Sequence, residues 1–148
     1  MKNIDGTPFV PEFAIDASIV INWFFSENEK SFEESIELLR VIKTGKIIVY
    51  SPEFLLIEVL NVFYKKKHFS SRKVEKIYRE LLNVGIKFIP FSINEVRDIQ
   101  KIVLKYNTTS YDAIYVEVAE RKKCKLITMD KELLRIKNLT MRLDQLGL

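Results

Sequence analysis

The sequence predicts an α/β protein, a three-layer α/β/α domain around a central, mainly parallel sheet of four or five strands. Short apolar, β-branched runs alternate with longer segments in which apolar residues recur at helical spacing. The run Ile47-Ile48-Val49-Tyr50 is also too apolar for a strand that keeps one face in water. Such runs are typical of strands inside a parallel sheet with helices on both sides.

The predicted elements follow an irregular N-terminal extension, residues 1–12, which Gly6, Pro8 and Pro11 interrupt. Residues 13–148 are expected to form one domain, because a chain of 148 residues that is 47% hydrophobic can bury a core without disulfides. Strands are predicted at 13–15, 47–50, 86–91 and 125–128, with a short edge strand at 140–143. Helices are predicted at 18–25, 32–44, 53–66, from 70 or 71 to Gly85, 92–106 and 110–122.

Capping residues predict several helix ends. Ser18 is expected to cap the first helix, and Gly45 to stop the second. Ser51-Pro52-Glu53 is interpreted as N-cap, first-turn proline and dipole-compensating acid of the third helix. That helix is apolar nearly all round, which predicts burial on most of its faces. In the helix at 92–106, the residues expected to point inward are Val96, Ile99, Val103 and Leu104.

Composition limits the function. The 24 basic and 20 acidic residues give a net charge of +4, which permits nucleic-acid binding without demanding it. The single cysteine, Cys124, argues against a disulfide framework or a cysteine zinc cluster and favours a cytoplasmic setting. We expect neither secretion nor membrane spanning, because the N-terminus lacks a signal-peptide core and the most apolar segment contains Glu58 and Asn61. His68 is the only histidine, so a Ser-His-Asp or Cys-His hydrolase has little support.

Four acids each interrupt an apolar element or follow a strand: Asp16, Glu58, Asp112 and Asp130. Strands of a parallel sheet end on a shared edge where α/β folds bind ligands, so acids placed there could meet. Crowded carboxylates raise one another's pKa unless divalent cations neutralise them, and Mg²⁺ or Mn²⁺ prefers such oxygen ligands. The sequence therefore suggests a site for phosphodiester hydrolysis that needs no histidine.

Simpler roles remain open for each acid. Both strand-following aspartates could be turn or cap residues, and Asp112 could simply compensate its helix dipole. Glu58 could share a solvent-exposed stripe with Asn61 and Lys65. The basic stretches at 65–67 and 121–125 are more often solvated helix ends than binding sites.

Four ordered motifs resemble those of PIN-domain ribonucleases, most closely VapC-type toxins of toxin-antitoxin pairs. They are Asp16-Ala17-Ser18, Pro52-Glu53 with Glu58-Val59-Leu60-Asn61, Ser110-Tyr111-Asp112-Ala113-Ile114-Tyr115 and Leu126-Ile127-Thr128-Met129-Asp130. The resemblance runs from Phe13 to the C-terminus and implies a PIN-like fold. It also implies a Mg²⁺- or Mn²⁺-dependent endoribonuclease that uses a metal-activated water, a small cognate antitoxin that covers the acidic groove, and a homodimer.

The resemblance assigns metal binding and catalysis to Asp16, Glu58, Asp112 and Asp130, supported by Ser18, Asn61 and Thr128. Candidate contacts to the RNA backbone are Lys65, Lys66, Lys67, Arg72, Arg121 and Lys122. The alternative is a non-catalytic PIN-fold module that binds RNA or protein. A response-regulator-like or phosphatase pocket is less favoured, because no Asp-x-Asp arrangement follows the first strand.

Overall fold

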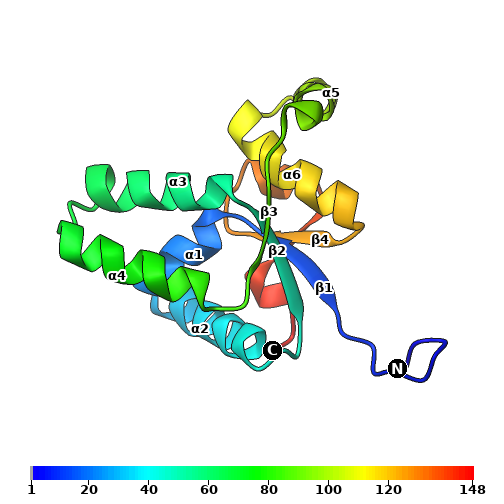
Figure 1. The fold of residues 1–148 in the computed structure, drawn as a ribbon, viewed down its shortest axis with the longest axis horizontal. Helices are drawn as coiled ribbons and strands as arrows, with labels where there is room; N and C mark the ends of the chain where they lie inside the picture. The colour runs from blue at the N-terminus through cyan, green and yellow to red at the C-terminus, as the bar shows by residue number, and fades with distance from the viewer. Residues whose placement is uncertain (1) are drawn as a thin grey trace.

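The computed structural model describes residues 2–148 and confirms the α/β architecture (Figure 1). Five strands form one all-parallel sheet in the order β3-β2-β1-β4-β5. The strands are β1 (Glu12–Ile15), β2 (Ile48–Pro52), β3 (Lys87–Ile89), β4 (Lys125–Thr128) and β5 (Thr140–Arg142). The α-helices are α1 (Ala17–Phe24), α2 (Glu29–Lys43), α3 (Phe54–Asn61), α4 (Ser71–Leu82), α5 (Val96–Tyr106) and α6 (Ser110–Lys122).

Helices cover both faces of the sheet, which gives the three predicted layers. Helix α6 packs across β1, β2 and β4, with α5 against it, while α1 packs against α2 and α3. Figure 1 shows α5 and α6 on one side of the strands and α1 and α2 on the other. Right-handed crossovers explain the split, because the chain moves one way from β1 to β3 and returns across the sheet to β4.

The strand order reverses between β1 and β4. Open α/β sheets bind ligands at the carboxyl ends of strands beside such a reversal. The two strands end at Ile15 and Thr128, and the hydroxyl of buried Ser51 holds the first of these ends by donating a 2.9 Å hydrogen bond to the Ile15 carbonyl. The strand interiors Val49, Leu126 and Ile127 have no exposed surface. The fold therefore presents one edge at which residues after β1 and β4 meet.

Two predicted helix starts are wrong. Asp16, not Ser18, is the N-cap of α1, because its carboxylate accepts from the Ser18 backbone N–H. Ser51 and Pro52 belong to β2, where they pair with β3, and Glu53 donates its backbone N–H to the Ile89 carbonyl. The strand ladder therefore extends β2 through residues expected to start α3. Helix α3 begins at Phe54 without a side-chain cap, and the π-helix Val62–Lys66 continues it.

Other ends agree with the prediction or shift by a few residues. Ser70 caps α4 and Ser92 forms a capping box on the 3₁₀ turn Ile93–Glu95 that leads into α5. Asn28 caps α2, which therefore begins before the predicted position. Gly45 follows the C-cap of α2 with φ +69°, a conformation in which glycine avoids strain.

Two predictions of burial are also wrong. Helix α3 buries Leu55 and Val59, but the Ile57 side chain is 63% exposed. In α5, Ile99 is buried and Val103 partly buried, whereas Val96 and Leu104 are 50% and 76% exposed. Helix α3 packs against α1 and α4, and α5 packs against α6, but neither arrangement covers these apolar side chains.

The N-terminal segment before β1 forms a turn closed by an antiparallel bridge between Lys2 and Pro8. The Asp5 carboxylate accepts from the backbone and hydroxyl of Thr7 within it. Met1 of the predicted extension lies outside the described residues. Within residues 2–148, no helix combines the length and apolar character that crossing a bilayer requires.

Candidate functional site

Asp16 lies at the end of β1, where its side chain is only 3% exposed. One carboxylate oxygen accepts from the Ser18 backbone at 3.1 Å and from the Ser18 hydroxyl at 2.5 Å. The other oxygen accepts from the hydroxyl of Thr128 at the end of β4. Asp16 therefore does cap a helix, as the simpler interpretation allowed. Its carboxylate is, however, also held from a second element, because Thr128 belongs to β4 whereas Ser18 belongs to α1.

Burial raises the pKa of Asp16 to about 6, against the hydrogen bonds from Ser18 and Thr128. The nearby Glu58 charge raises this pKa further. A buried carboxylate of this kind is costly unless a cation meets it. None of the ion pairs formed within residues 2–148 includes Asp16 or the other three candidate acids, although many other acids of the chain are paired.

Glu58 projects from α3 toward α6 and is half-buried. Its Oε2 accepts a 2.7 Å hydrogen bond from the hydroxyl of Tyr115. Burial raises the pKa of Glu58, and the charges of Asp112 and Asp130 add to this rise. The alternative of a solvent stripe therefore describes the exposed Asn61 but not Glu58 itself.

Asp112 lies in the first turn of α6, where Thr109 is the N-cap. Burial raises the pKa of the Asp112 carboxyl, and the charges of Asp130 and Glu132 raise it further. The dipole of α6 stabilises the carboxylate, as expected for this position, but it does not offset these like charges completely.

Asp130 follows β4 and turns the chain into a short 3₁₀ helix, Leu133–Arg135. Its Oδ1 accepts from the backbones of Glu132 and Leu133 at 2.7 and 3.1 Å. Its own backbone N–H donates to the Thr128 hydroxyl at 2.9 Å. Asp130 therefore does stabilise a turn, as the simpler interpretation allowed. The same geometry leaves its charge close enough to raise the pKa of both Glu58 and Asp112.

The four candidate acids thus come from four elements and affect one another electrostatically at one edge of the sheet. Carboxylate oxygens without basic partners are the donor set that suits Mg²⁺ or Mn²⁺. Among residues 2–148, no three acidic, histidine or cysteine side chains are grouped closely enough to hold an ion in their present positions. The residues nevertheless fit such an ion in the chemistry of their donor atoms.

The predicted supporting residues differ in position. Ser18, besides donating to Asp16, accepts from the Met129 backbone at 2.9 Å. Thr128 links Asp16 to the Asp130 backbone in the same way. Asn61 is exposed at the end of α3 and forms no side-chain hydrogen bond with the described residues. Two hydroxyls therefore join the ends of β1 and β4, and the structure does not connect Asn61 to them.

The basic candidates near α3 lie on the π-helix and the start of α4. Lys66 lies close enough to Glu58 for its charge to lower the pKa of that carboxyl. Lys67 pairs with Glu27 at 3.5 Å and lies over the Phe25 ring. Lys65 and Arg72 are exposed. Lys66 is thus the basic candidate with an electrostatic link to the acids.

The basic candidates of α6 lie at its other end. Arg121 pairs with Glu95 and Glu117, and Lys122 lies over the Tyr50 ring. At 1.5 Å per residue they are about 14 Å along the helix from Asp112. The structure does not bring Arg121 and Lys122 to the acids.

Sequence reasoning missed several residues around the acids. Tyr115 was not selected as a functional residue, although its position one turn after Tyr111 on α6 was visible. A cavity of about 520 Å³ beside Thr128 and Met129 also contains three basic residues that were not considered, Lys30, Lys131 and Arg142. They come from separate segments, so no local pattern links them.

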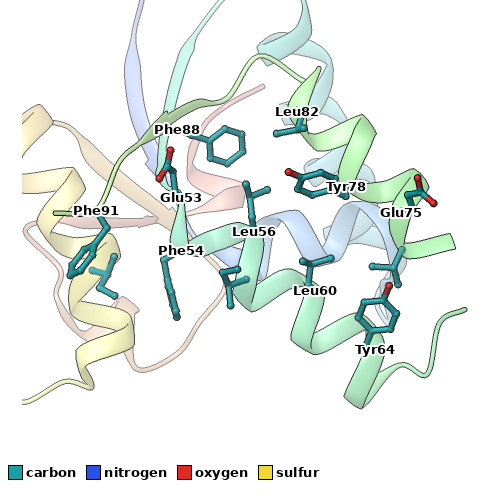
Figure 2. Close-up of a pocket in the computed structure, with 13 residues that line it drawn as sticks. Glu53, Phe54, Leu56, Leu60, Tyr64, Glu75, Tyr78, Leu82, Phe88 and Phe91 are labelled. Carbon is teal, nitrogen blue, oxygen red and sulfur yellow. The ribbon is translucent and has the colours of Figure 1, made fainter. Parts of the chain in front are cut away.

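A second cavity, of about 880 Å³, is mainly apolar and opens between α3, α4 and β3. Figure 2 shows Leu56 and Leu60 of α3 facing Tyr78 and Leu82 of α4 across it. Phe88 also lines the cavity, and Glu53 and Glu75 add two acids to its lining. This groove accounts for the unexpected exposure of the outer face of α3.

Several solved structures have similar folds. PAE2754 from Pyrobaculum aerophilum aligns with TM-score 0.68 and 19% identity over 92% of this chain and 86% of that chain. VapC20 from Mycobacterium tuberculosis, described as a Sarcin-Ricin loop cleaving toxin, has TM-score 0.66 and 10% identity. The alignment covers 84% of this chain and 94% of that chain. VapBC2 from Rickettsia felis, in a structure with a DNA fragment from its promoter, has TM-score 0.63 and 12% identity. The alignment covers 88% of this chain and 98% of that chain.

At these identities the structural similarity shows the fold alone. Comparison with curated protein sequences gave no match. The PIN domain family model, in contrast, matches residues 13–139, which include all four candidate acids. The match spans most of the chain, and the protein therefore belongs to the PIN domain family.

Proposed function

We propose that the protein is a divalent-metal-dependent endoribonuclease and the toxin of a toxin-antitoxin pair. The observation that carries this proposal is that four carboxylates, none of them in an ion pair within residues 2–148, influence one another electrostatically at the edge where the strand order reverses. The similarity to VapC20, described as a toxin that cleaves the Sarcin-Ricin loop, supports RNA as the substrate class.

Asp16, Glu58, Asp112 and Asp130 would hold Mg²⁺ or Mn²⁺. The bound ion supplies Lewis-acid chemistry, which neutralises phosphate charge and lowers the pKa of water. Asp16 is the most rigid of the four, because Ser18 and Thr128 fix both of its oxygens. In each of the three half-buried acids, only one carboxylate oxygen accepts hydrogen bonds from the described residues. The basic side chain of Lys66 lies near this edge and would attract the RNA backbone.

The direct test is cleavage of single-stranded and looped RNA by purified protein with Mg²⁺, Mn²⁺ or EDTA. Cleavage should require the ion, and Asp16→Asn should abolish it. Asp98→Asn is the matched control, because Asp98 is an exposed aspartate of α5 paired with Lys101. Equal cleavage by wild type and Asp16→Asn would refute the assignment. RNA binding without any cleavage would instead favour a non-catalytic binding module.

We propose that the antitoxin binds in the apolar groove between α3 and α4 (Figure 2). Similar folds occur in VapBC2, a toxin-antitoxin complex, which supports a protein partner. An amphipathic antitoxin helix would bury its apolar face in the groove and place basic residues against Glu53 and Glu75.

Coexpression with the neighbouring gene product tests this partner. Ile57→Lys, at a 63% exposed position of the groove, should prevent copurification and leave RNA cleavage intact. Leu148→Lys, at a 51% exposed position outside the groove, is the control. Growth arrest should appear when the protein is expressed alone, disappear with the partner, and depend on Asp16.

A homodimer would cover a second apolar area next to α5. Val96 and Leu104 are exposed there beside a cavity of about 400 Å³ that Phe91 also lines. Light scattering should find a dimer of wild type and a monomer of Leu104→Glu. A wild-type monomer at micromolar concentration would contradict this part of the proposal.

A further inference from the structure

Helices α3 and α6 contact each other through two pairs of side chains, one turn apart. Phe54 and Glu58 are separated by four residues on α3, as are Tyr111 and Tyr115 on α6, so each pair shares a helix face. Tyr115 donates its 2.7 Å hydrogen bond to Glu58. Tyr111 stacks on Phe54, with ring centroids 5.6 Å apart and an angle of 11° between the planes.

The stacked pair differs from the bonded pair in exposure. Tyr115 is 2% exposed, whereas Tyr111 remains 65% exposed although one side of its ring contacts Phe54. Phe54 is itself held by an edge contact to Tyr115, with centroids 6.3 Å apart. The Tyr111 ring is thus held on one side by Phe54, while much of its surface is exposed to water.

This ring also lies beside the acids. Tyr111 directly precedes Asp112, and the Phe54 that supports it lies one turn, about 5.4 Å, from Glu58 along α3. An aromatic side chain here can reach the nucleotide next to a phosphate held by the carboxylate edge. Every nucleobase has a π-face that stacks on such a ring, and stacking tolerates different sequences.

We propose that Tyr111 is a stacking platform for one nucleobase next to the scissile phosphate. This inference rests on the proposed ribonuclease function and adds to it a residue that contacts the base. Bases in a duplex already stack on their neighbours, so the platform selects RNA whose bases are unpaired, in single strands or loops. Phe54 and Tyr115 orient the platform without contacting the base.

The first experiment compares Tyr111→Ala, Tyr111→Phe and the control Phe9→Ala, which removes a 52% exposed aromatic ring from the N-terminal segment. Tyr111→Ala should raise KM for single-stranded RNA by roughly 5- to 150-fold and leave kcat little changed. Tyr111→Phe should retain the wild-type KM, because it keeps the ring. In the Asp16→Asn background, the Kd for RNA should rise with Tyr111→Ala in the same proportion.

The second experiment uses fluorescence to detect stacking of a base on the side chain at position 111. Trp23 is the only tryptophan and is 5% exposed, so Tyr111→Trp adds an accessible fluorophore against a shielded background. Single-stranded RNA should quench the fluorescence of Tyr111→Trp in the Asp16→Asn background, and a blunt RNA duplex should not. This variant and Tyr111→Phe keep the test valid if Tyr111→Ala does not fold.

The outcomes separate this inference from the function on which it rests. If wild type cleaves RNA but Tyr111→Ala has an unchanged KM and Tyr111→Trp shows no quenching, the stacking role is wrong and the ribonuclease proposal stands. Loss of dimer or antitoxin binding in Tyr111→Ala, with RNA binding unchanged, would likewise overturn it in favour of a protein contact. If wild type neither cleaves nor binds RNA, both proposals fail.

Discussion

Helices α3 and α6 both carry apolar residues on most of their faces, yet the fold surrounds them differently. Helix α6 packs across three strands and under α5, so Val116 and Ala119 have no exposed surface. Helix α3 packs against α1 and α4, and its Ile57 remains largely exposed. Apolar residues alone therefore do not tell whether a helix face is core or surface. The number of neighbouring elements decides it.

The different surroundings of α3 and α6 also give the two helices different proposed roles. The buried face of α6 provides a rigid base from which Tyr115 holds Glu58. The open face of α3 forms a wall of the groove proposed to receive the antitoxin. Helix α3 is thus proposed to supply a catalytic carboxylate on one side and a partner-binding surface on the other.

The largest expected effect compares the two faces of α3. Leu55→Ala should lower the free energy of unfolding by about 2 to 5 kcal/mol, because it opens a cavity at a fully buried position. Ile57→Ala should change it by less than about 0.5 kcal/mol, because Ile57 is exposed. Urea unfolding of both variants measures the difference. Equal losses would show that Ile57 is buried in solution, for example by a second copy.

The next effect concerns Asp16 and pH in metal-free protein. Its pKa of about 6 in the folded protein exceeds the usual 3.8, so its carboxyl favours folding most below pH 4 and this stability is lost as the pH rises through about 6. Asp16→Asn should therefore be more stable than wild type by about 2 to 3 kcal/mol at pH 8 and similar to it at pH 4. Urea unfolding in EDTA checks this, and a constant difference across pH would contradict it.

A smaller effect separates two residues assigned the same supporting role. Ser18→Ala removes the hydroxyl that joins Asp16 to Met129 and should weaken Mn²⁺ affinity by about 10- to 100-fold. Asn61→Ala should leave the affinity unchanged, because the Asn61 side chain has no hydrogen bond to the acids. Calorimetric titration with Mn²⁺ compares them. A similar loss in both variants would show that Asn61 reaches the ion.

The smallest effect tests the bond between α6 and α3. Tyr115→Phe should destabilise the protein by about 1 kcal/mol, since water can partly replace the lost hydroxyl at half-buried Glu58. The pKa of Glu58 should rise further, because the hydrogen bond from Tyr115 lowers it. Carboxyl-detected NMR titration measures this pKa. A lower pKa in the variant would mean that Tyr115 does not stabilise the Glu58 carboxylate.

Much of the fold could be predicted because local patterns agree with the tertiary arrangement. Strands β4 and β5 and helix α6 lie at or within one residue of their predicted ends. The apolar residues of β4 and the Thr109 cap of α6 are local signals of these ends. The start of α3 could not be predicted, because pairing of β2 with β3 overrides the helix-start signal of Ser51-Pro52-Glu53. The exposure of Leu104 could not be predicted for a related reason. The spacing of apolar residues along a helix does not reveal which of its faces another element covers.

The amino-acid sequence by itself determined the four candidate acids, their order, and the alternation of strands and helices that places Asp16 and Asp130 after strands and the other two acids on helices. Local chemistry suffices for this, because caps, turns and periodicity act within a few residues. Only the tertiary structure decided that Asp16 is clamped by Ser18 and Thr128, that Glu58 turns to Tyr115, and that Tyr111 stacks on Phe54. Most of these contacts join residues far apart in the chain, so they arise only when the sheet brings β1 and β4 together and packs α3 beside α6.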